Sequence, residues 1–421
     1  MKLYLKNVGK VHSASVEIKG ITVIAGENNT GKSTVGKALF AVFNSFYHIE
    51  KKIVSERIDS ISNQLFLMYR NQPNQILWDF DISELANDIV KNAVNARAKK
   101  ENVNKSIFET IAHYDEKLVT VVDETEIADG VERIAALLNV SEDDIFKRVL
   151  QRRLDAEFNQ QINNVYTDDE SIIRLDIQNE QIDIRISNNE VSNVDKKIDL
   201  GTEVIYIDDP FVLDEVPARV FRTNTPYTDH RTHLKQKLHF SRRDLNLVEE
   251  IVTDSKLDCI YSKVSSVCEG DVVRDKRAAL GYRIPGSDKL LDVKNLSTGL
   301  KTFAILKKLL VAGYIEYNGT IILDEPEIHL HPEWQLLFAE LIVLLHREFG
   351  LHVLLNTHSP YFLNAIEVYA AKYDVSSNCK YYLTKDIGNA AVVEDVSSNI
   401  EKIYSKLARP LQYLENIYQC D

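Results

Sequence analysis

One segment near the start of the 421-residue chain predicts the core of the fold: Ile21-Thr-Val-Ile-Ala-Gly26-Glu-Asn-Asn-Thr-Gly31-Lys32-Ser33. Its first five residues form a β-branched run that is typical of a buried strand. Gly26 to Ser33 then fits the pattern G-x-x-x-x-G-K-[ST], and apolar residues from Val35 to Phe43 recur at helical spacing. A strand, a glycine-rich loop and a helix in this order predict a phosphate-binding loop, because backbone N–H groups and the helix N-terminus face the anion.

The residues of this loop are the predicted nucleotide contacts. Lys32 is expected to reach the β- and γ-phosphates of the nucleotide, and the Ser33 hydroxyl is expected to ligate Mg²⁺. A glycine-rich turn without a ligand is the alternative interpretation, and the flanking strand and helix argue against it. The predicted contacts in this segment are Gly26, Glu27, Asn28, Asn29, Thr30, Gly31, Lys32, Ser33 and Thr34.

A second apolar strand, Thr320–Leu323, ends in two acids, Asp324 and Glu325. Mg²⁺ prefers an octahedral shell with few protein ligands, so Asp324 is predicted to hold the ion through water. Glu325 can then face the water that attacks the γ-phosphate and act as its base or orient it. Such an acidic pair is often only the start of a solvated loop, but the upstream phosphate loop favours the metal.

Two further motifs complete the pattern. The segment Asn295-Leu-Ser297-Thr-Gly299-Leu-Lys301 precedes an amphipathic helix, and Asn356-Thr-His358-Ser-Pro360 follows the apolar strand Leu351–Leu355. With these motifs in this order, the sequence resembles AAA ATPases of the ATP-binding-cassette (ABC) type, specifically the SMC-, RecF- and OLD-like branch. The usual signature of that family is L-S-G-G-Q, from which this chain departs at Thr298 and Leu300.

The resemblance implies an ABC-type α/β head, with a mostly parallel sheet flanked by helices, an antiparallel sheet and a large helical insertion. It also implies that Ser297 and Gly299 contact the γ-phosphate of ATP bound to a second copy. His358 would contact the γ-phosphate as a switch histidine, beside Glu325 and Lys32 in catalysis. Hydrolysis of ATP, with Mg²⁺, would therefore need a head-to-tail dimer or a higher oligomer.

A zinc site is rejected at this stage, and two other points stay open. His329 and His331 have a spacing that could suggest zinc, but the whole Asp324–Pro332 run belongs to the resembled family, as a dimer-facing loop. The glutamine that normally sits at the Mg²⁺ site of the family has no identifiable counterpart. The end of Val204–Asp208 could face the nucleotide, although a plain strand-to-helix turn is the favoured interpretation.

The motifs divide the chain as follows. Residues 1–48 and 278–421 are expected to be the two parts of the ATPase head, with a helical insertion at 49–168 between them. Residues 169–210 return to the head as strands, and 211–277 form a helical lobe with a basic segment. That segment suggests contact with DNA or RNA, and the alternative is a solvated helix face or a patch that docks an acidic partner. Its basic residues are Arg219, Arg222, Arg231, Lys235, Lys237, Arg242 and Arg243.

Composition and motifs together set the expected class. The net charge of −13 argues against a surface coated for nucleic acid, and no apolar run is long enough to span a membrane. Four scattered cysteines and the absence of a visible signal peptide indicate a cytoplasmic protein with reduced thiols. The chain resembles the regulatory ATPases of antiphage systems such as Septu and PARIS, which control a separately encoded effector. A RecF- or SMC-like DNA-repair or chromosome-maintenance ATPase is the alternative.

Two features favour the antiphage class over its alternatives. The insertion is too short and irregular for the long coiled coil of an SMC protein. The 63 residues after His358 are too few for the C-terminal nuclease of OLD-type proteins. Any nuclease or toxin is therefore expected on another chain.

Overall fold

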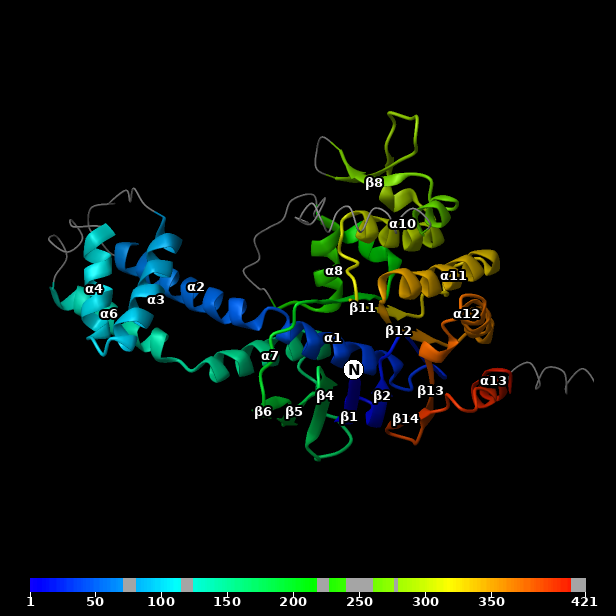
Figure 1. Cartoon of the computed structure of the whole chain (residues 1–421), viewed down its shortest axis with the longest axis horizontal. Helices are drawn as coiled ribbons and strands as arrows, with labels where there is room; N and C mark the ends of the chain where they lie inside the picture. Colours follow the sequence, from blue (N-terminus) through cyan, green and yellow to red (C-terminus); the bar gives the residue numbers. More distant parts are fainter. Residues whose placement is uncertain (71–80, 115–123, 218–226, 240–259, 276–278, 410–421) are drawn as a thin grey trace, which may run out of the picture. The chain divides into compact units, whose positions relative to one another are not determined.

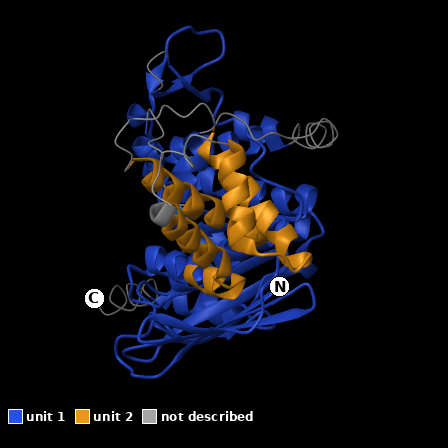
Figure 2. Ribbon diagram, turned by 90° about the vertical axis from the view of Figure 1, so that its left-hand side faces the viewer, with its two compact units in different colours: residues 1–47, 149–421 blue, residues 48–148 orange. Residues whose placement is uncertain are grey.

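The computed structural model describes residues 1–70, 81–114, 124–217, 227–239, 260–275 and 279–409 (Figure 1). The chain forms two compact units, His48–Arg148 and the remainder, Met1–Tyr47 with Val149–Asp421 (Figure 2). The smaller unit ends at Arg148 and not at the expected residue 168, because the second half of α7 (Glu142–Phe158) bonds to residues of the larger unit. Gln151, for example, donates to the Asn189 carbonyl over 2.9 Å.

The described secondary structure of the smaller unit is all helical. Its helices are α2 (Ile49–Arg70), α3 (Ile82–Ala98), α4 (Val103–Tyr114), α6 (Glu124–Asn139) and the start of α7. Asp81 caps α3 by accepting a hydrogen bond from the Ser83 N–H, which satisfies one of the free donors at the helix N-terminus. Apolar residues of four helices meet in a separate core, with Ile61, Leu85, Ile107 and Ile134 fully or almost fully buried. Helical spacing of apolar residues therefore produces an independent helical packing.

The larger unit contains an 11-stranded sheet in the order β6-β5-β4-β1-β2-β14-β13-β3-β12-β11-β7. The run from β13 to β7 is parallel throughout, whereas β6 to β2 pair antiparallel, so the expected parallel and antiparallel parts form one continuous sheet. The strands are β1 (Lys2–Val8), β2 (Val11–Glu17), β3 (Ile21–Ala25), β4 (Ser171–Ile177), β5 (Glu180–Ser187), β6 (Glu190–Val194), β7 (Val204–Ile207), β11 (Thr320–Asp324), β12 (His352–Thr357), β13 (Cys379–Asp386) and β14 (Ala391–Asp395).

A small antiparallel sheet lies outside this main one. It contains β8 (Asp271–Arg274), β9 (Leu280–Arg283) and β10 (Leu291–Asp292) in the order β10-β9-β8. β8 lies within residues 211–277, the segment predicted to be a helical lobe. The described helices of the larger unit are α1 (Lys32–Phe46), α8 (His230–His239), α10 (Thr298–Val311), α11 (Pro332–Phe349), α12 (Pro360–Lys372) and α13 (Glu401–Leu407), with 3-10 turns η1 (Pro210–Glu215), η2 (Val293–Asn295) and η3 (Ser376–Asn378).

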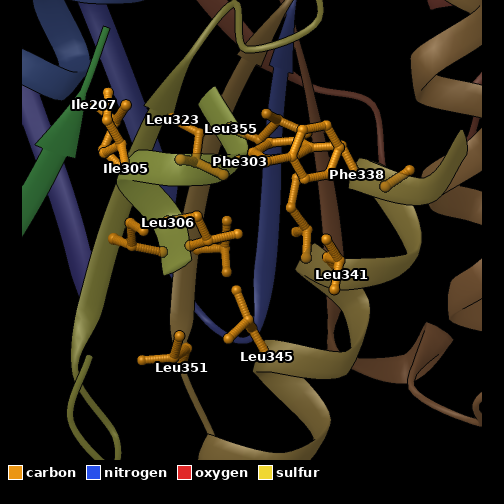
Figure 3. Packing of buried hydrophobic residues seen from close by; sticks show 14 of the residues in the cluster. Ile207, Phe303, Ile305, Leu306, Leu323, Phe338, Leu341, Leu345, Leu351 and Leu355 are labelled. Carbon is orange, nitrogen blue, oxygen red and sulfur yellow. The ribbon is translucent and has the colours of Figure 1, made fainter. Parts of the chain in front are cut away.

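Alternate residues of the parallel strands face opposite helical layers, as the period of two requires. Ile207, Leu323 and Leu355 point into the core formed with α10 and α11, as Figure 3 shows. In that core Phe303 of α10 packs edge-on against Phe338 of α11, with ring centroids 5.4 Å apart. The other face of the sheet packs against α1. The core thus fixes the start of α10, and with it the signature segment (Asn295–Lys301), relative to the strand ends.

None of the helices that the structure describes is long and apolar enough to cross a membrane.

Candidate nucleotide site

Four parallel strands end at one edge of the sheet and bring the predicted motifs together there. In the β11–β12 register Asp324 is paired with Asn356, and in the β12–β3 register Thr357 is paired with Ala25. The phosphate loop (Gly26–Ser33), the acidic pair and the switch histidine therefore emerge side by side. In α/β sheets this carboxyl edge is where ligands bind, because the loops that follow the strands converge on it.

The phosphate loop is held by contacts that need glycine. Gly26 has a φ of 155°, and a Cβ added there would lie 1.9 Å from Thr384 Oγ1. Thr384 of β13 also hydrogen bonds with Thr30 Oγ1 over 2.5 Å, and Thr30 in turn donates to the Glu27 carbonyl. Gly31 ends the loop with a φ of 80°. The loop is thus braced by a strand more than three hundred residues away in the sequence.

Lys32 points back over the loop, almost entirely buried. Its Nζ donates to the carbonyls of Gly26 (3.1 Å) and Glu27 (2.9 Å), and it lies 3.2 Å from Glu325 Oε1. The first turn of α1 has no side-chain cap, so its N–H groups are left facing the loop. A cation and free helix N–H groups at one point make an anion-binding arrangement.

A pocket of about 460 Å³ opens in front of this arrangement. Residues Asn28 to Thr34 form one wall, so the loop faces the pocket with Ser33 exposed. The remaining lining residues are Lys10, Asp208, Asp324, Glu325 and Ile328. Gly26 and Glu27, also predicted contacts, do not line the pocket, and their carbonyls accept hydrogen bonds from Lys32.

Asp324 is fixed at the end of β11 by two donors. The Tyr206 hydroxyl donates to Oδ2 over 2.8 Å, and Asn356 Nδ2 donates to Oδ1 over 3.0 Å. Burial, together with the neighbouring carboxylate, raises the pKa of Tyr206 well above its usual value, so the hydroxyl keeps its proton. Tyr206 had no predicted role, and only the pairing of β7 with β11 places it here.

Glu325 has an unusual backbone. Its φ of 49° is in the left-handed region, which costs roughly 1–2 kcal/mol for a residue with a Cβ. Its N–H donates to the Asn356 carbonyl over 2.9 Å, which holds the strained turn. The turn places Oε1 3.2 Å from Lys32 Nζ and 3.3 Å from His358 Nδ1. Lys32 and His358 thus both contact the Glu325 carboxylate, so the three residues predicted to be catalytic lie together.

Glu327 is a buried acid whose role the sequence did not indicate. Its Oε1 accepts hydrogen bonds from the Thr357 hydroxyl and, over 3.4 Å, from the His358 N–H. Burial raises the pKa of this carboxyl, although the Thr357 hydrogen bond opposes the shift. Glu327 thereby ties the loop after β11 to the loop that carries His358. Its place in the Asp324-Glu-Pro-Glu327 run was the only available signal.

The signature segment lies at a second pocket, of about 400 Å³. Ser297 caps α10, and a Cβ at Gly299 would lie 3.0 Å from the His329 carbonyl. Ser297, Thr298 and Gly299 line this pocket with His329, His331 and Trp334. The pocket shares no described lining residue with the phosphate pocket. Within one chain, Ser297 and Gly299 are therefore not brought to the phosphate loop.

The basic segment is described only in part. Arg219, Arg222, Arg242 and Arg243 lie outside the described residues. The other three bases lie on α8 and each pairs with an acid: Arg231 with Asp208 (2.7 Å), Lys235 with Glu215 (2.6 Å), and Lys237 with Glu203. In the described part of the segment, the predicted contact residues therefore form ion pairs with acids of this chain.

Asp208, at the end of β7, lines the phosphate pocket. The plain-turn interpretation of this strand end is thus incomplete: Asp209 does cap η1, but Asp208 faces the pocket. Asp208 Oδ2 lies 3.1 Å from His230 Nε2. Burial opposes protonation of His230, but hydrogen bonds with Asp208 and Glu157 outweigh it and raise the pKa of His230 to about 9.

A parallel sheet, a braced glycine loop with a buried lysine, and an acidic strand end around one pocket define a P-loop type of α/β head. Comparison with protein families agrees. The chain belongs to the family described as "AAA domain, putative AbiEii toxin, Type IV TA system", whose model matches residues 21–364. This confirms the broad family predicted from the motifs, whereas the likeness to Septu and PARIS subunits stays a prediction.

Solved structures similar to this chain include heads of SMC proteins. An SMC head bound to the C-terminal winged-helix domain of ScpA is 11% identical, with a TM-score of 0.43 and coverage of 95% of this chain and 98% of that chain. The SMC head domain from Thermotoga maritima is 10% identical, with a TM-score of 0.37 and coverage of 94% and 98%. A third, derived from Pyrococcus furiosus and bound to the C-terminal domain of ScpA, is 11% identical, with a TM-score of 0.39 and coverage of 99% and 98%. Likenesses this distant bear on neither function nor partners.

Proposed function

We propose that this protein binds ATP in the phosphate pocket and hydrolyses it, working as a head-to-tail dimer or a higher oligomer. The observation that carries the proposal is the meeting of Lys32, Glu325 and His358 at the pocket, with Lys32 Nζ and His358 Nδ1 3.2 Å and 3.3 Å from the same Glu325 oxygen. A structural salt bridge alone would not require a glycine loop, an uncapped helix N-terminus and a strained glutamate at the same place.

The residues at the pocket suit Mg²⁺. The donors in position are all oxygen atoms, namely the exposed Ser33 hydroxyl and the Asp324 carboxylate, whose orientation two hydrogen bonds fix. Mg²⁺ binds through one or two such groups, with water and phosphate oxygens as its other ligands. When bound, the ion would neutralise charge on the phosphates. Ser33 and Asp324 would hold it.

The remaining chemistry falls to the side chains of the chain. Lys32 would neutralise the γ-phosphate, which displaces the Glu325 carboxylate from its present partner. The freed carboxylate would then orient a water and accept its proton as the water oxygen attacks phosphorus and the bond to ADP breaks. His358, beside Glu325, would contact the γ-phosphate and respond to its loss. Glu327 would keep the His358 loop in place.

The separate signature pocket supports the dimer. Ser297 and Gly299 lie at the N-terminus of α10, a 14-residue helix, where a phosphate is favoured. Since these residues do not line the phosphate pocket of their own chain, they would meet the γ-phosphate held by a partner copy. The site would then be complete only in the ATP-bound dimer.

The biological role that we propose is regulatory. The family is described in terms of a putative AbiEii toxin and a type IV toxin–antitoxin system. From the resemblance of the motifs we infer a sensor ATPase of antiphage defence, in which ATP turnover holds or releases a separately encoded effector such as a nuclease or toxin. This role fails if the purified chain itself degrades DNA or RNA with Mg²⁺ and a carboxylate change outside Asp324 and Glu325 stops it.

The test of the ATPase proposal is the variant Lys32→Ala. Lys32 is expected to reach two phosphates, and each charge-assisted contact contributes about 1.5–3 kcal/mol. Loss of both contacts should therefore weaken binding of a fluorescent ATP analogue by at least about 100-fold. Lys37→Ala, on the same helix, is the matched control. Unchanged affinity in a folded Lys32→Ala protein would disprove the assignment of the phosphate pocket.

A further inference from the structure

Tyr206 stands directly behind the carboxylate that faces the pocket. It is fully buried, and its hydroxyl donates to Asp324 Oδ2 over 2.8 Å. Tyr206 lies on β7 and Asp324 on β11, and the parallel register pairs Ile207 with Leu323 at the end of both strands. Because a carboxylate rotates easily about its last torsion, a donor on each oxygen is needed to fix its plane. Tyr206 supplies one of these donors and Asn356 the other.

The tyrosine ring is itself held on two sides. His230 of α8 stacks on it, with centroids 4.2 Å apart and planes inclined by 23°. On the α1 side, a Cβ added at Gly36 would lie 3.1 Å from the Tyr206 hydroxyl oxygen and 3.2 Å from Cζ. Glycine at this position therefore lets the phosphate-loop helix approach the ring closely. Phe40, one turn further along α1, meets the ring edge-on at 6.2 Å.

His230 connects the pocket to another helix. Its Nδ1 lies 2.6 Å from Glu157 Oε1, and its backbone N–H donates to Glu157 Oε2 over 3.0 Å. Its Nε2 lies 3.1 Å from Asp208, which lines the phosphate pocket. Glu157 belongs to α7, whose first residues belong to the helical unit. One imidazole thus contacts the pocket wall, the tyrosine behind Asp324 and α7.

Other buried groups of α7 and α8 strengthen this connection. Arg153, one turn before Glu157, donates to the Thr228 carbonyl over 3.2 Å and lies over the Phe40 ring. His233 of α8 lies 2.9 Å from Glu203 and meets Phe40 edge-on. These polar groups are buried, so moving one of them leaves its hydrogen-bonding partner unpaired. Each unpaired group costs about 1–3 kcal/mol of stability. The network is therefore expected to move as a unit.

We propose that Tyr206 and His230 are positioning residues that hold Asp324 and Asp208 at the phosphate pocket and couple their arrangement to Glu157 on α7. The inference rests on the proposed function, in which Asp324 faces Mg²⁺. A ligand held at Asp324 would shift this carboxylate, and the Tyr206 hydroxyl that donates to it would follow. His230, which stacks on the tyrosine ring and contacts Glu157, would pass the shift to α7. Because α7 is continuous with the helical unit, the network gives nucleotide state a covalent route to that unit.

The experiment compares hydroxyl-deletion variants. Tyr206→Phe removes the donor to Asp324 and leaves the ring for His230 to stack on. Tyr382→Phe is the matched control, because Tyr382 is also buried in the main sheet and its hydroxyl has one hydrogen bond, from the Glu17 N–H. Two quantities are measured: the Mg²⁺ concentration that half-saturates binding of a fluorescent ATP analogue, and hydrogen exchange of residues 149–158 with and without analogue and Mg²⁺.

Tyr206→Phe should raise the half-saturating Mg²⁺ concentration about tenfold, as expected for one lost bond to a carboxylate. It should also abolish the nucleotide-dependent protection of α7 that we expect in the wild-type protein. Tyr382→Phe should change neither quantity. Glu157→Gln, which keeps the shape of the side chain but removes its charge, should leave the Mg²⁺ requirement within about twofold and lose the α7 response.

The outcomes separate this inference from the function on which it rests. If Asp324→Ala removes the Mg²⁺ dependence while Tyr206→Phe behaves like Tyr382→Phe, the positioning role is wrong and the nucleotide site stands. If Asp324→Ala has no effect either, the metal assignment itself is wrong. Should Tyr206→Phe fail to fold, Glu157→Gln decides: an α7 response equal to that of the wild type overturns the coupling.

Discussion

Replacing Glu325 with glutamine tests the centre of the proposed mechanism. The change keeps the size and shape of the side chain but removes the charge that lies 3.2 Å from Lys32 Nζ. Two unit charges at that distance attract by about 5 kcal/mol at an effective dielectric constant of about 20. Desolvation of the buried lysine and the partly exposed glutamate offset most of this, which leaves a net contribution of roughly 1–2 kcal/mol.

This contribution has opposite consequences for binding and for hydrolysis. In the wild-type protein ATP must displace Glu325 from Lys32, whereas in Glu325→Gln the lysine is already free. ATP should therefore bind roughly tenfold more tightly, since 1.4 kcal/mol is a factor of ten. Hydrolysis should fall by about 10²- to 10⁴-fold, because glutamine cannot accept the proton of the attacking water. The variant should accumulate as an ATP-bound dimer.

Three measurements decide the result. Equilibrium titration with a fluorescent ATP analogue gives the affinity, single-turnover kinetics gives the hydrolysis rate, and light scattering with and without ATP gives the oligomeric state. Glu333→Gln is the matched control, because Glu333 is an exposed acid in the first turn of α11 and lines neither pocket. A wild-type rate in Glu325→Gln would refute the catalytic role. Weaker binding of ATP would refute the competition for Lys32.

Two further predictions concern the partner copy and the stability of the head. A mixture of Ser297→Arg and Lys32→Ala protomers should recover part of the ATPase activity that each lacks alone, because one composite site per dimer is intact; a dead mixture that still forms heterodimers would mean that the sites are not shared. Burial would raise the pKa of Glu340, but hydrogen bonds from two lysines and a tyrosine outweigh it and lower that pKa from 4.5 to about 2. The stabilisation is therefore present above about pH 4.5 and lost as pH falls towards 2, so Glu340→Gln should cost about 2–3 kcal/mol of unfolding free energy at pH 7 and almost nothing near pH 2. Urea unfolding at both pH values checks this, and an equal loss at both would contradict it.

Local pattern was enough to predict the elements that carry the site. The β-branched run of β3, the glycine loop and the apolar spacing of α1 involve neighbours within one or two turns of chain. The same holds for β11 with its acids and for β12 before His358. Such features follow from the periods of strand and helix and from the backbone freedom of glycine, all of which are encoded locally.

Contacts between residues far apart in the chain could be seen only in the folded structure. Thr384 against Gly26, Tyr206 against Asp324, Glu327 against Thr357 and Asp208 at the pocket all depend on which strands are neighbours. Alternation of apolar and polar residues shows that a strand has two different faces. It does not show which strand lies beside that strand or in what register the two pair. The acids that pair with the basic residues of α8 could not be predicted from the sequence for the same reason. The sequence alone was enough to predict a phosphate loop and an acidic strand end. The side chains that stand behind them depend on the order of the strands in the sheet, and long-range packing sets that order.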